Sequence, residues 1–96
     1  MTLLQLQYII AVDRFRSFAK AAEHCGVAQP TLSKMIAKLE EELDVRIFDR
    51  TSRNVEPTST GEKIVMQAVK TVQEAARIAE IAADTRNGLS GDMRIV

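Results

Sequence analysis

Apolar residues recur at helical spacing in three stretches of the first half of the chain. In residues 3–14, leucine and isoleucine recur every three or four positions, which is the period of an amphipathic helix. A second helix is predicted between Ser17, whose hydroxyl can accept a free backbone N–H, and Gly26, which tolerates the left-handed conformation of a helix end. A third helix is expected to begin at Gln29-Pro30, with Gln29 at the cap and Pro30 as the first helical residue.

The third predicted helix has two unlike faces. Its apolar residues are spaced 4-3-4 and form one stripe, which comprises Leu32, Ile36, Leu39 and Leu43. The opposite side carries small, polar and basic residues, which are Pro30, Lys34, Ala37, Lys38 and Glu41, flanked by Thr31 and Ser33. Two helices joined by a three-residue turn, the second with such an outer face, are typical of a helix-turn-helix that places its second helix in a DNA major groove.

Beyond residue 43 the helical period stops, and two short runs of strand-forming residues flank a polar segment. Residues 45–48 and 54–56 on either side of the polar residues 49–53 predict a β-hairpin. The hydroxyl of Thr58 is expected to cap a fourth helix. This helix should be long, because residues 62–87 contain no helix breaker. The predicted fold is therefore mostly α. It comprises a winged helix-turn-helix of three helices and a short hairpin wing over residues 1–57, a long helix over 58–88, and a hinge over 89–96.

The long helix carries an apolar stripe that the small domain cannot cover along its whole length. Its residues recur at 4-3-4-3-4, as in a coiled-coil seam, and are Val65, Val69, Val72, Ala76, Ala79 and Ala83. Further apolar residues widen this face, namely Ile64, Ala68, Ala75, Ile78 and Ala82. Part of the stripe can pack back onto residues 3–14 of the same chain, but its length indicates that the rest meets a second subunit. The seam therefore predicts a homodimer.

The composition of the chain restricts the classes of function that it can have. Lys plus Arg and Asp plus Glu each number 13 in the 96 residues, so the net charge is zero and any contact with nucleic acid must rest on local charge placement. Cys25 and His24 are the only residues of their kinds, and no nucleophile–base or metal constellation is present, so we expect no enzyme, no metal and no cofactor. The carboxylates of residues 40–42 are interpreted as a solvated helix face. No signal peptide or membrane span is recognisable, which predicts a cytoplasmic protein without a membrane partner.

Several motifs in unbroken register resemble the LysR-type transcriptional regulators. They are Ser17-Phe18-x-x-Ala21-Ala22, Val27-Ala28-Gln29-Pro30-Thr31-Leu32-Ser33, Ile36-x-x-Leu39-Glu40-x-x-Leu43, Phe48-x-Arg50 and Thr58-x-x-Gly61. The resemblance implies a winged helix-turn-helix, a linker helix that pairs with a second subunit, and sequence-specific binding to a pseudo-palindromic site in double-stranded DNA. It also implies a C-terminal effector-binding domain, whose start resembles residues 91–96. Within the family, the chain is slightly closer to the OxyR-like peroxide-responsive branch.

The resemblance also implies which residues contact DNA. Major-groove contacts fall to Gln29, Pro30, Thr31, Ser33, Lys34 and Lys38. The wing contact falls chiefly to Arg53, and the polar hairpin tip adds Arg50, Thr51 and Ser52. For Arg50, the alternative is a salt bridge to Asp49 or to the helix that ends near Glu42. The family usually has glycine where Asp44 stands, which predicts some backbone strain there.

The sequence also predicts the partners of the protein and leaves one alternative function open. A full-length protein is expected to be a dimer or a tetramer, and a small-molecule or redox effector is expected to act only through the C-terminal domain. The alternative function is a helical dimerisation or protein-interaction module that does not bind DNA, an interpretation that the zero net charge favours. Salt dependence separates the two, because a dimer that binds phosphates must weaken as salt rises.

Overall fold

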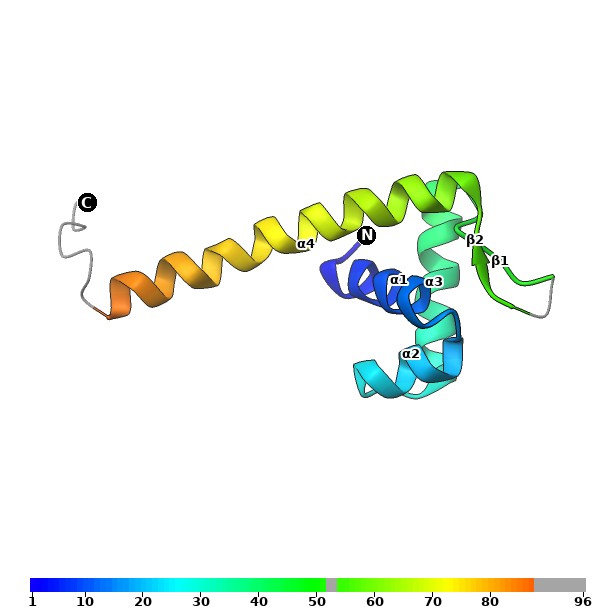
Figure 1. Cartoon of the computed structure of the whole chain (residues 1–96), viewed down its shortest axis with the longest axis horizontal. Helices are drawn as coiled ribbons and strands as arrows, with labels where there is room; N and C mark the ends of the chain where they lie inside the picture. The colour runs from blue at the N-terminus through cyan, green and yellow to red at the C-terminus, as the bar shows by residue number, and fades with distance from the viewer. Residues whose placement is uncertain (52–53, 88–96) are drawn as a thin grey trace.

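The computed structural model describes residues 1–51 and 54–87, which form four helices and a two-stranded antiparallel hairpin (Figure 1). The elements, in chain order, are α1 (Leu3–Phe15), α2 (Phe18–Cys25), α3 (Gln29–Leu43), β1 (Phe48–Asp49), β2 (Glu56–Pro57) and α4 (Ser59–Arg86). The predicted winged helix-turn-helix followed by a long helix is confirmed. The proposed hinge at residues 89–96 lies outside the described residues.

Local hydrogen bonds set most of the helix ends. The Ser17 hydroxyl accepts from the Lys20 N–H, and Gly26 ends α2 in the left-handed conformation at φ 72°, both as predicted. The start of α3 lies one residue earlier than predicted: Ala28, not Gln29, is the cap residue, and it makes no side-chain capping bond. The Ala28 carbonyl instead accepts from the N–H groups of Thr31 and Leu32, which draws Gln29 into the helix despite the proline that follows it.

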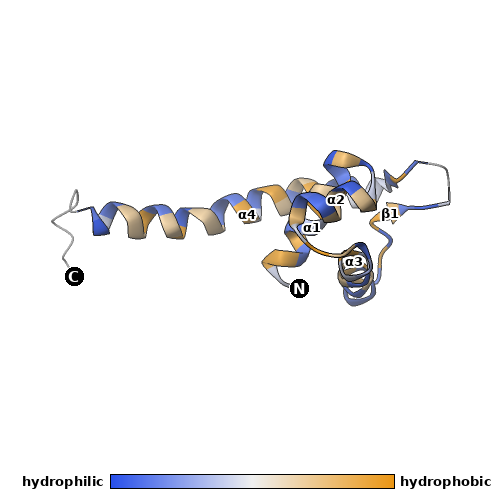
Figure 2. Ribbon diagram, turned by 90° about the horizontal axis from the view of Figure 1, so that it is seen from below, coloured by the Kyte–Doolittle hydropathy of each residue, from blue (hydrophilic) through white to orange (hydrophobic). Residues whose placement is uncertain are grey.

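The core lies where α1 crosses the other helices. Its largest fully buried side chains come from α1, α3 and the segment that leads into the wing, and are Ile9, Val12, Leu32, Ile36, Leu39, Ile47 and Phe48. Figure 2 shows hydrophobic and hydrophilic residues alternating along the helices. The predicted stripe of α3 therefore faces the core, although Leu43 at its end is only half-buried.

The hairpin is shorter than predicted, with two residues in each strand. Phe48 pairs with Pro57 and Asp49 with Glu56, whereas residues 45–47 are not in a strand. The reason lies in competing partners for that segment. The Ile47 N–H donates to a carboxylate oxygen of Glu40, and its carbonyl accepts from the Thr58 N–H at 2.9 Å.

α4 begins in close contact with this segment. Thr58 caps the helix through a bond from the Gly61 N–H to its hydroxyl at 2.8 Å, as predicted. Gly61 is buried, and a Cβ there would overlap the carbonyl oxygen of Ile47 and lie 2.8 Å from its carbonyl carbon. The glycine is therefore needed for the close approach of α4 to the chain that leads into the wing.

We expect Gly61→Ala to lower the free energy of unfolding by about 3 kcal/mol, because the added methyl group meets backbone that cannot rotate away. Gly26→Ala is the matched control, since a Cβ at Gly26 meets nothing within 4 Å and only the left-handed backbone opposes it, at a cost of about 1 kcal/mol. Urea denaturation of both variants measures the difference. Equal losses would show that the approach at Ile47 does not constrain the fold.

Candidate nucleic-acid interface

The outer face of α3 is free of contacts with the core. Thr31, Lys34, Ala37 and Lys38 are exposed and Ser33 is half-buried, whereas Leu32, Ile36 and Leu39 on the other side are fully buried. Gln29 and Pro30, in the first turn, are exposed as well. The structure thus brings the predicted major-groove residues together on one uncovered face. Whether they contact DNA stays a prediction.

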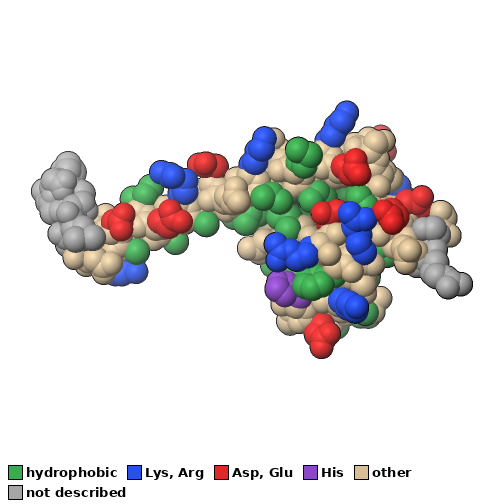
Figure 3. Space-filling view, in the orientation of Figure 1, with side chains coloured by type: hydrophobic (Ala, Val, Ile, Leu, Met, Phe, Trp, Pro, Cys, Tyr) green, Lys and Arg blue, Asp and Glu red, His purple; other side chains and the backbone are tan. Residues whose placement is uncertain are grey.

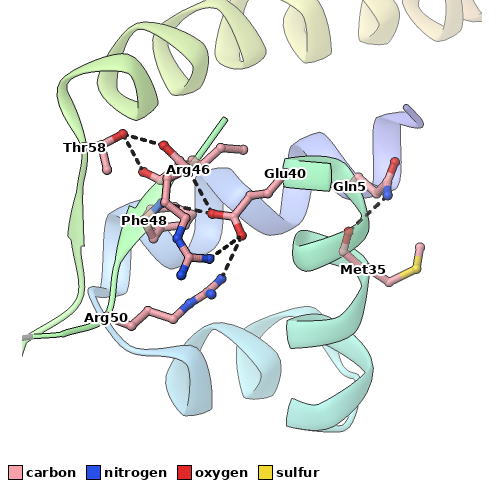
Figure 4. A network of polar contacts seen from close by, with 8 residues as sticks. Gln5, Met35, Glu40, Arg46, Phe48, Arg50 and Thr58 are labelled. Carbon is pink, nitrogen blue, oxygen red and sulfur yellow. Dashed lines mark hydrogen bonds and ion pairs between the residues drawn. The ribbon is translucent and has the colours of Figure 1, made fainter. Parts of the chain in front are cut away.

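The prediction that residues 40–42 form a solvated face is wrong for Glu40. Its side chain is only 6% exposed, and one carboxylate oxygen accepts from the N–H groups of Ile47 and Phe48 at 2.8 and 3.2 Å. The other oxygen lies 3.4 Å from Arg50 Nη2 and 3.7 Å from Arg46 Nη1 (Figure 4). Glu40 therefore fastens the start of the wing to the last turn of α3.

Sequence reasoning missed this role of Glu40, although a signal was available. Ile36, Leu39 and Glu40 share one face at helical spacing, so the carboxylate at the edge of the apolar stripe had to be buried or paired. What the periodicity could not supply was the partner, because the wing returns to α3 only in the folded chain.

Arg50 lies at the base of the wing. Its guanidinium carbon is 4.8 Å from the centre of the Phe18 ring, and Phe18 in turn meets Phe48 edge to face. The side chain remains 35% exposed. The structure therefore bears out the alternative of an ion pair to α3, but with Glu40 as the partner. Glu42 instead binds the N-terminal ammonium at 2.7 Å.

The described part of the wing tip contains a tight turn. The Asp49 carboxylate accepts from the hydroxyl of Thr51 at 2.7 Å and from its N–H at 2.9 Å, and these two hydrogen bonds lower the pKa of Asp49. The Thr51 hydroxyl is thus engaged with the turn itself. Ser52 and Arg53, which were assigned to the wing contact, lie outside the described residues.

The face of α4 changes character along the helix. Val65 is 6% exposed and belongs to the core of its own chain, so little of its side chain is left for the predicted dimer seam. Val69 and Val72 are half-buried, Ala83 is half-buried, and Ala76 and Ala79 are exposed. Figure 3 shows hydrophobic side chains along α4 where it leaves the domain.

Two large apolar side chains stand out on the projecting half of α4. Ile78 is 71% and Ile81 is 60% exposed, and Leu3 and Leu4 of α1 are also about half exposed, at 46% and 47%. Ile81 was not part of the predicted face, because it lies outside the 4-3 repeat. Ile78 and Ile81 are three residues apart and therefore neighbours on the helix surface, so they form one exposed apolar patch, which is a candidate surface for contact with another molecule.

None of the described helices combines the length and hydropathy that a bilayer crossing requires. Within residues 1–51 and 54–87, no group of three or more His, Cys, Asp or Glu side chains is placed to hold a metal ion.

Comparison with known proteins agrees with this geometry. Residues 3–62 match the model of the bacterial regulatory helix-turn-helix proteins of the lysR family. The chain is 40% identical over 95 residues to the DNA-binding transcriptional dual regulator OxyR of Escherichia coli K12, covering 99% of this chain and 31% of that protein. It is 37% identical to a hydrogen peroxide-inducible genes activator of Haemophilus influenzae, of which it covers 32%. The chain thus spans about a third of the length of these curated relatives.

Solved structures give the same result. The BenM DNA-binding domain in a complex with catB site 1 DNA superposes with a TM-score of 0.90 at 34% identity, covering 96% of this chain and 99% of that one. Full-length OxyR C199D of Pseudomonas aeruginosa matches with a TM-score of 0.84 at 47% identity, covering 86% of this chain and 28% of that one. This chain belongs to the lysR family of bacterial regulatory helix-turn-helix proteins and has the fold of its DNA-binding domain.

Proposed function

We propose that this chain is the DNA-binding part of a longer transcriptional regulator and binds a pseudo-palindromic duplex site as a homodimer. α3 enters the major groove, and the wing reaches the flanking minor groove. The observation that carries the proposal is the polar, basic outer face of α3. It is left uncovered by the domain and lies beside the wing, in a fold that is solved elsewhere in a complex with DNA.

Local charge supports this proposal despite the zero net charge. Lys34 and Lys38 are exposed on the outer face of α3, and Arg46 is 67% exposed on the segment that follows the helix. Glu40 is buried and already satisfied by two backbone N–H groups, whereas the exposed carboxylates of Glu41 and Asp44 lie at the C-terminal end of α3, away from its first turns. Cations gathered on one face attract phosphates even when the whole chain is neutral.

The proposal assigns a separate role to each segment of the chain. Residues 1–57 carry the DNA contacts, residues 58–88 form the linker and dimerisation helix, and residues 89–96 lead into an effector-binding domain. A small-molecule or redox signal acts through that domain, and the protein works in the cytoplasm, where the chromosome is. Two copies joined through α4 hold two recognition helices at a fixed spacing, which suits a site with two-fold symmetry.

Removing the side chains of Ser33 and Lys34 tests the proposed major-groove contact. We expect Ser33→Ala with Lys34→Ala to weaken binding to the best duplex that the wild-type chain selects from a randomised library by about 2–4 kcal/mol, at 1–3 kcal/mol per specific contact. Lys70→Ala removes an exposed lysine from α4 and is the charge-matched control. Fluorescence anisotropy measures both. A folded double variant with wild-type affinity would place the recognition surface elsewhere.

The alternative function is a dimerising protein-interaction module that does not bind DNA. The salt dependence of DNA binding by the wild-type chain distinguishes the two functions. A DNA-binding dimer loses affinity steeply as salt rises, because each neutralised phosphate releases counterions. If no duplex from the library is retained at low salt, the DNA-binding proposal fails and the interaction module stands.

A further inference from the structure

A hollow of about 440 Å³ lies between the first turns of α3 and the base of the wing. Its lining combines one wall from α2, one from α3 and one cation from the wing, and the residues are Phe18, Gln29, Ser33, Lys34, Ala37 and Arg50. Arg50 therefore faces the recognition helix, although it was grouped with the wing tip by its place in the sequence.

The guanidinium of Arg50 is held from two sides. Phe18 lies under it at 4.8 Å, and Glu40 pairs with Nη2 at 3.4 Å. Glu40 is itself held in place by two backbone N–H groups, which donate to its second oxygen. Among the described residues Arg50 has no further hydrogen-bond acceptor, so most of its five N–H donors are left for another molecule.

The charges around the hollow favour an anion. Glu40 is shared between Arg50 and Arg46, so one buried carboxylate faces two guanidinium groups, and Lys34 adds an exposed ammonium group at the rim. A planar guanidinium with its N–H groups free matches phosphate oxygens closely. No acidic side chain is among the residues that line this hollow.

We propose that this hollow binds one backbone phosphate of the DNA at the edge of the major groove, with Arg50 as its fixed cation. This inference rests on the proposed DNA binding and adds a defined contact to it. Arg50 acts beside α3 and touches the backbone, whereas the wing tip acts in the minor groove. A phosphate contact sets the register of α3 on the duplex and carries no sequence information directly.

The test removes the charge of Arg50 and keeps a polar side chain there. Gln is two bonds shorter than Arg, so the contact with Glu40 is weakened along with the charge, and the melting temperature of Arg50→Gln is therefore measured beside its binding. Arg77→Gln, which removes an exposed arginine from the projecting part of α4, is the control. Binding is measured on the duplex that the wild-type chain selects and on sequence variants of it, from about 0.05 to 0.3 M salt. We expect Arg50→Gln to lose roughly tenfold in affinity. We also expect it to lower the salt slope by about one unit per protomer and to leave the ranking of the duplexes unchanged.

A second measurement locates the contact on the DNA. Single phosphates of the selected duplex are replaced, one at a time, by uncharged methylphosphonates. The wild-type chain should be weakened at a small set of positions, and Arg50→Gln should become indifferent to one of them in each half-site while still responding to the others.

Three results would overturn the inference. A lower melting temperature with an unchanged salt slope would leave Arg50 as a structural partner of Glu40 only. A changed ranking of the duplexes would show that Arg50 reads a base. If the wild-type chain itself binds no duplex, the proposed function fails and this contact fails with it, which differs from the first two results, in which wild-type binding is intact.

Discussion

Ala76→Glu combined with Ala79→Glu is expected to convert the proposed dimer into monomers and to reduce binding to the selected duplex by at least a hundredfold. Both side chains are exposed in the single chain, so the charges do not disturb its core. In the dimer they would place like charges in the seam and forfeit apolar burial worth about 25 cal/mol per Å². Affinity falls with dimerisation because the second half-site then has to be bound from solution, without the high effective concentration that a linked copy provides.

Sedimentation velocity gives the mass, and anisotropy gives the affinity of the same samples. The control is Gln67→Glu with Thr85→Glu, which adds the same charge to exposed positions about 160° around α4 from the seam. The control should remain a dimer and bind DNA with little change. The control charges lie on the same side of α4 as the exposed Ile78 and Ile81, so a dimeric Ala76/Ala79 variant together with a dissociated control would place the interface on the Ile78/Ile81 face instead.

Glu40→Ala is expected to lower the free energy of unfolding by about 3–5 kcal/mol, a large part of the stability of a domain this size. The substitution leaves the N–H groups of Ile47 and Phe48 buried without an acceptor and removes the carboxylate that faces Arg46 and Arg50. Arg50 then loses one of its two supports, so we also expect weaker DNA binding in whatever fraction stays folded.

Urea denaturation followed by circular dichroism measures the loss. Glu41→Ala is the neighbouring control, because Glu41 is exposed and its removal should change stability by no more than about 0.5 kcal/mol. The loss of stability in Glu40→Gln should lie between those of Glu40→Ala and Glu41→Ala. Its amide oxygen can still accept hydrogen bonds from the backbone N–H groups, although the charge is gone. Equal midpoints for the variants at positions 40 and 41 would show that the carboxylate does not hold the wing to α3.

The helices of this protein and the outer face of its third helix could be predicted from the sequence. Each helix has its own apolar period and its own end signals, such as Ser17 before α2, Gly26 after it and Thr58 before α4. These are local: a hydroxyl meets an N–H three residues on, and a stripe of Leu32, Ile36 and Leu39 selects one side of a helix whatever packs against it. The opposite side of α3 then had to face outward.

The contacts between distant segments were decided only by the tertiary structure. The period of α4 marked its apolar face, but which of these residues its own chain buries depends on how the helices pack, and Val65 lies in the core of its own chain. The partner of Glu40 and the need for Gly61 likewise arise where residues 46–48 return to α3 and α4. Arg50 was assigned to the wing by its neighbours in the chain, whereas the fold turns it toward Phe18 and α3. Sequence spacing specifies the contacts within one helix, but a buried carboxylate, a close backbone approach and a shared hollow exist only once separate elements have packed together.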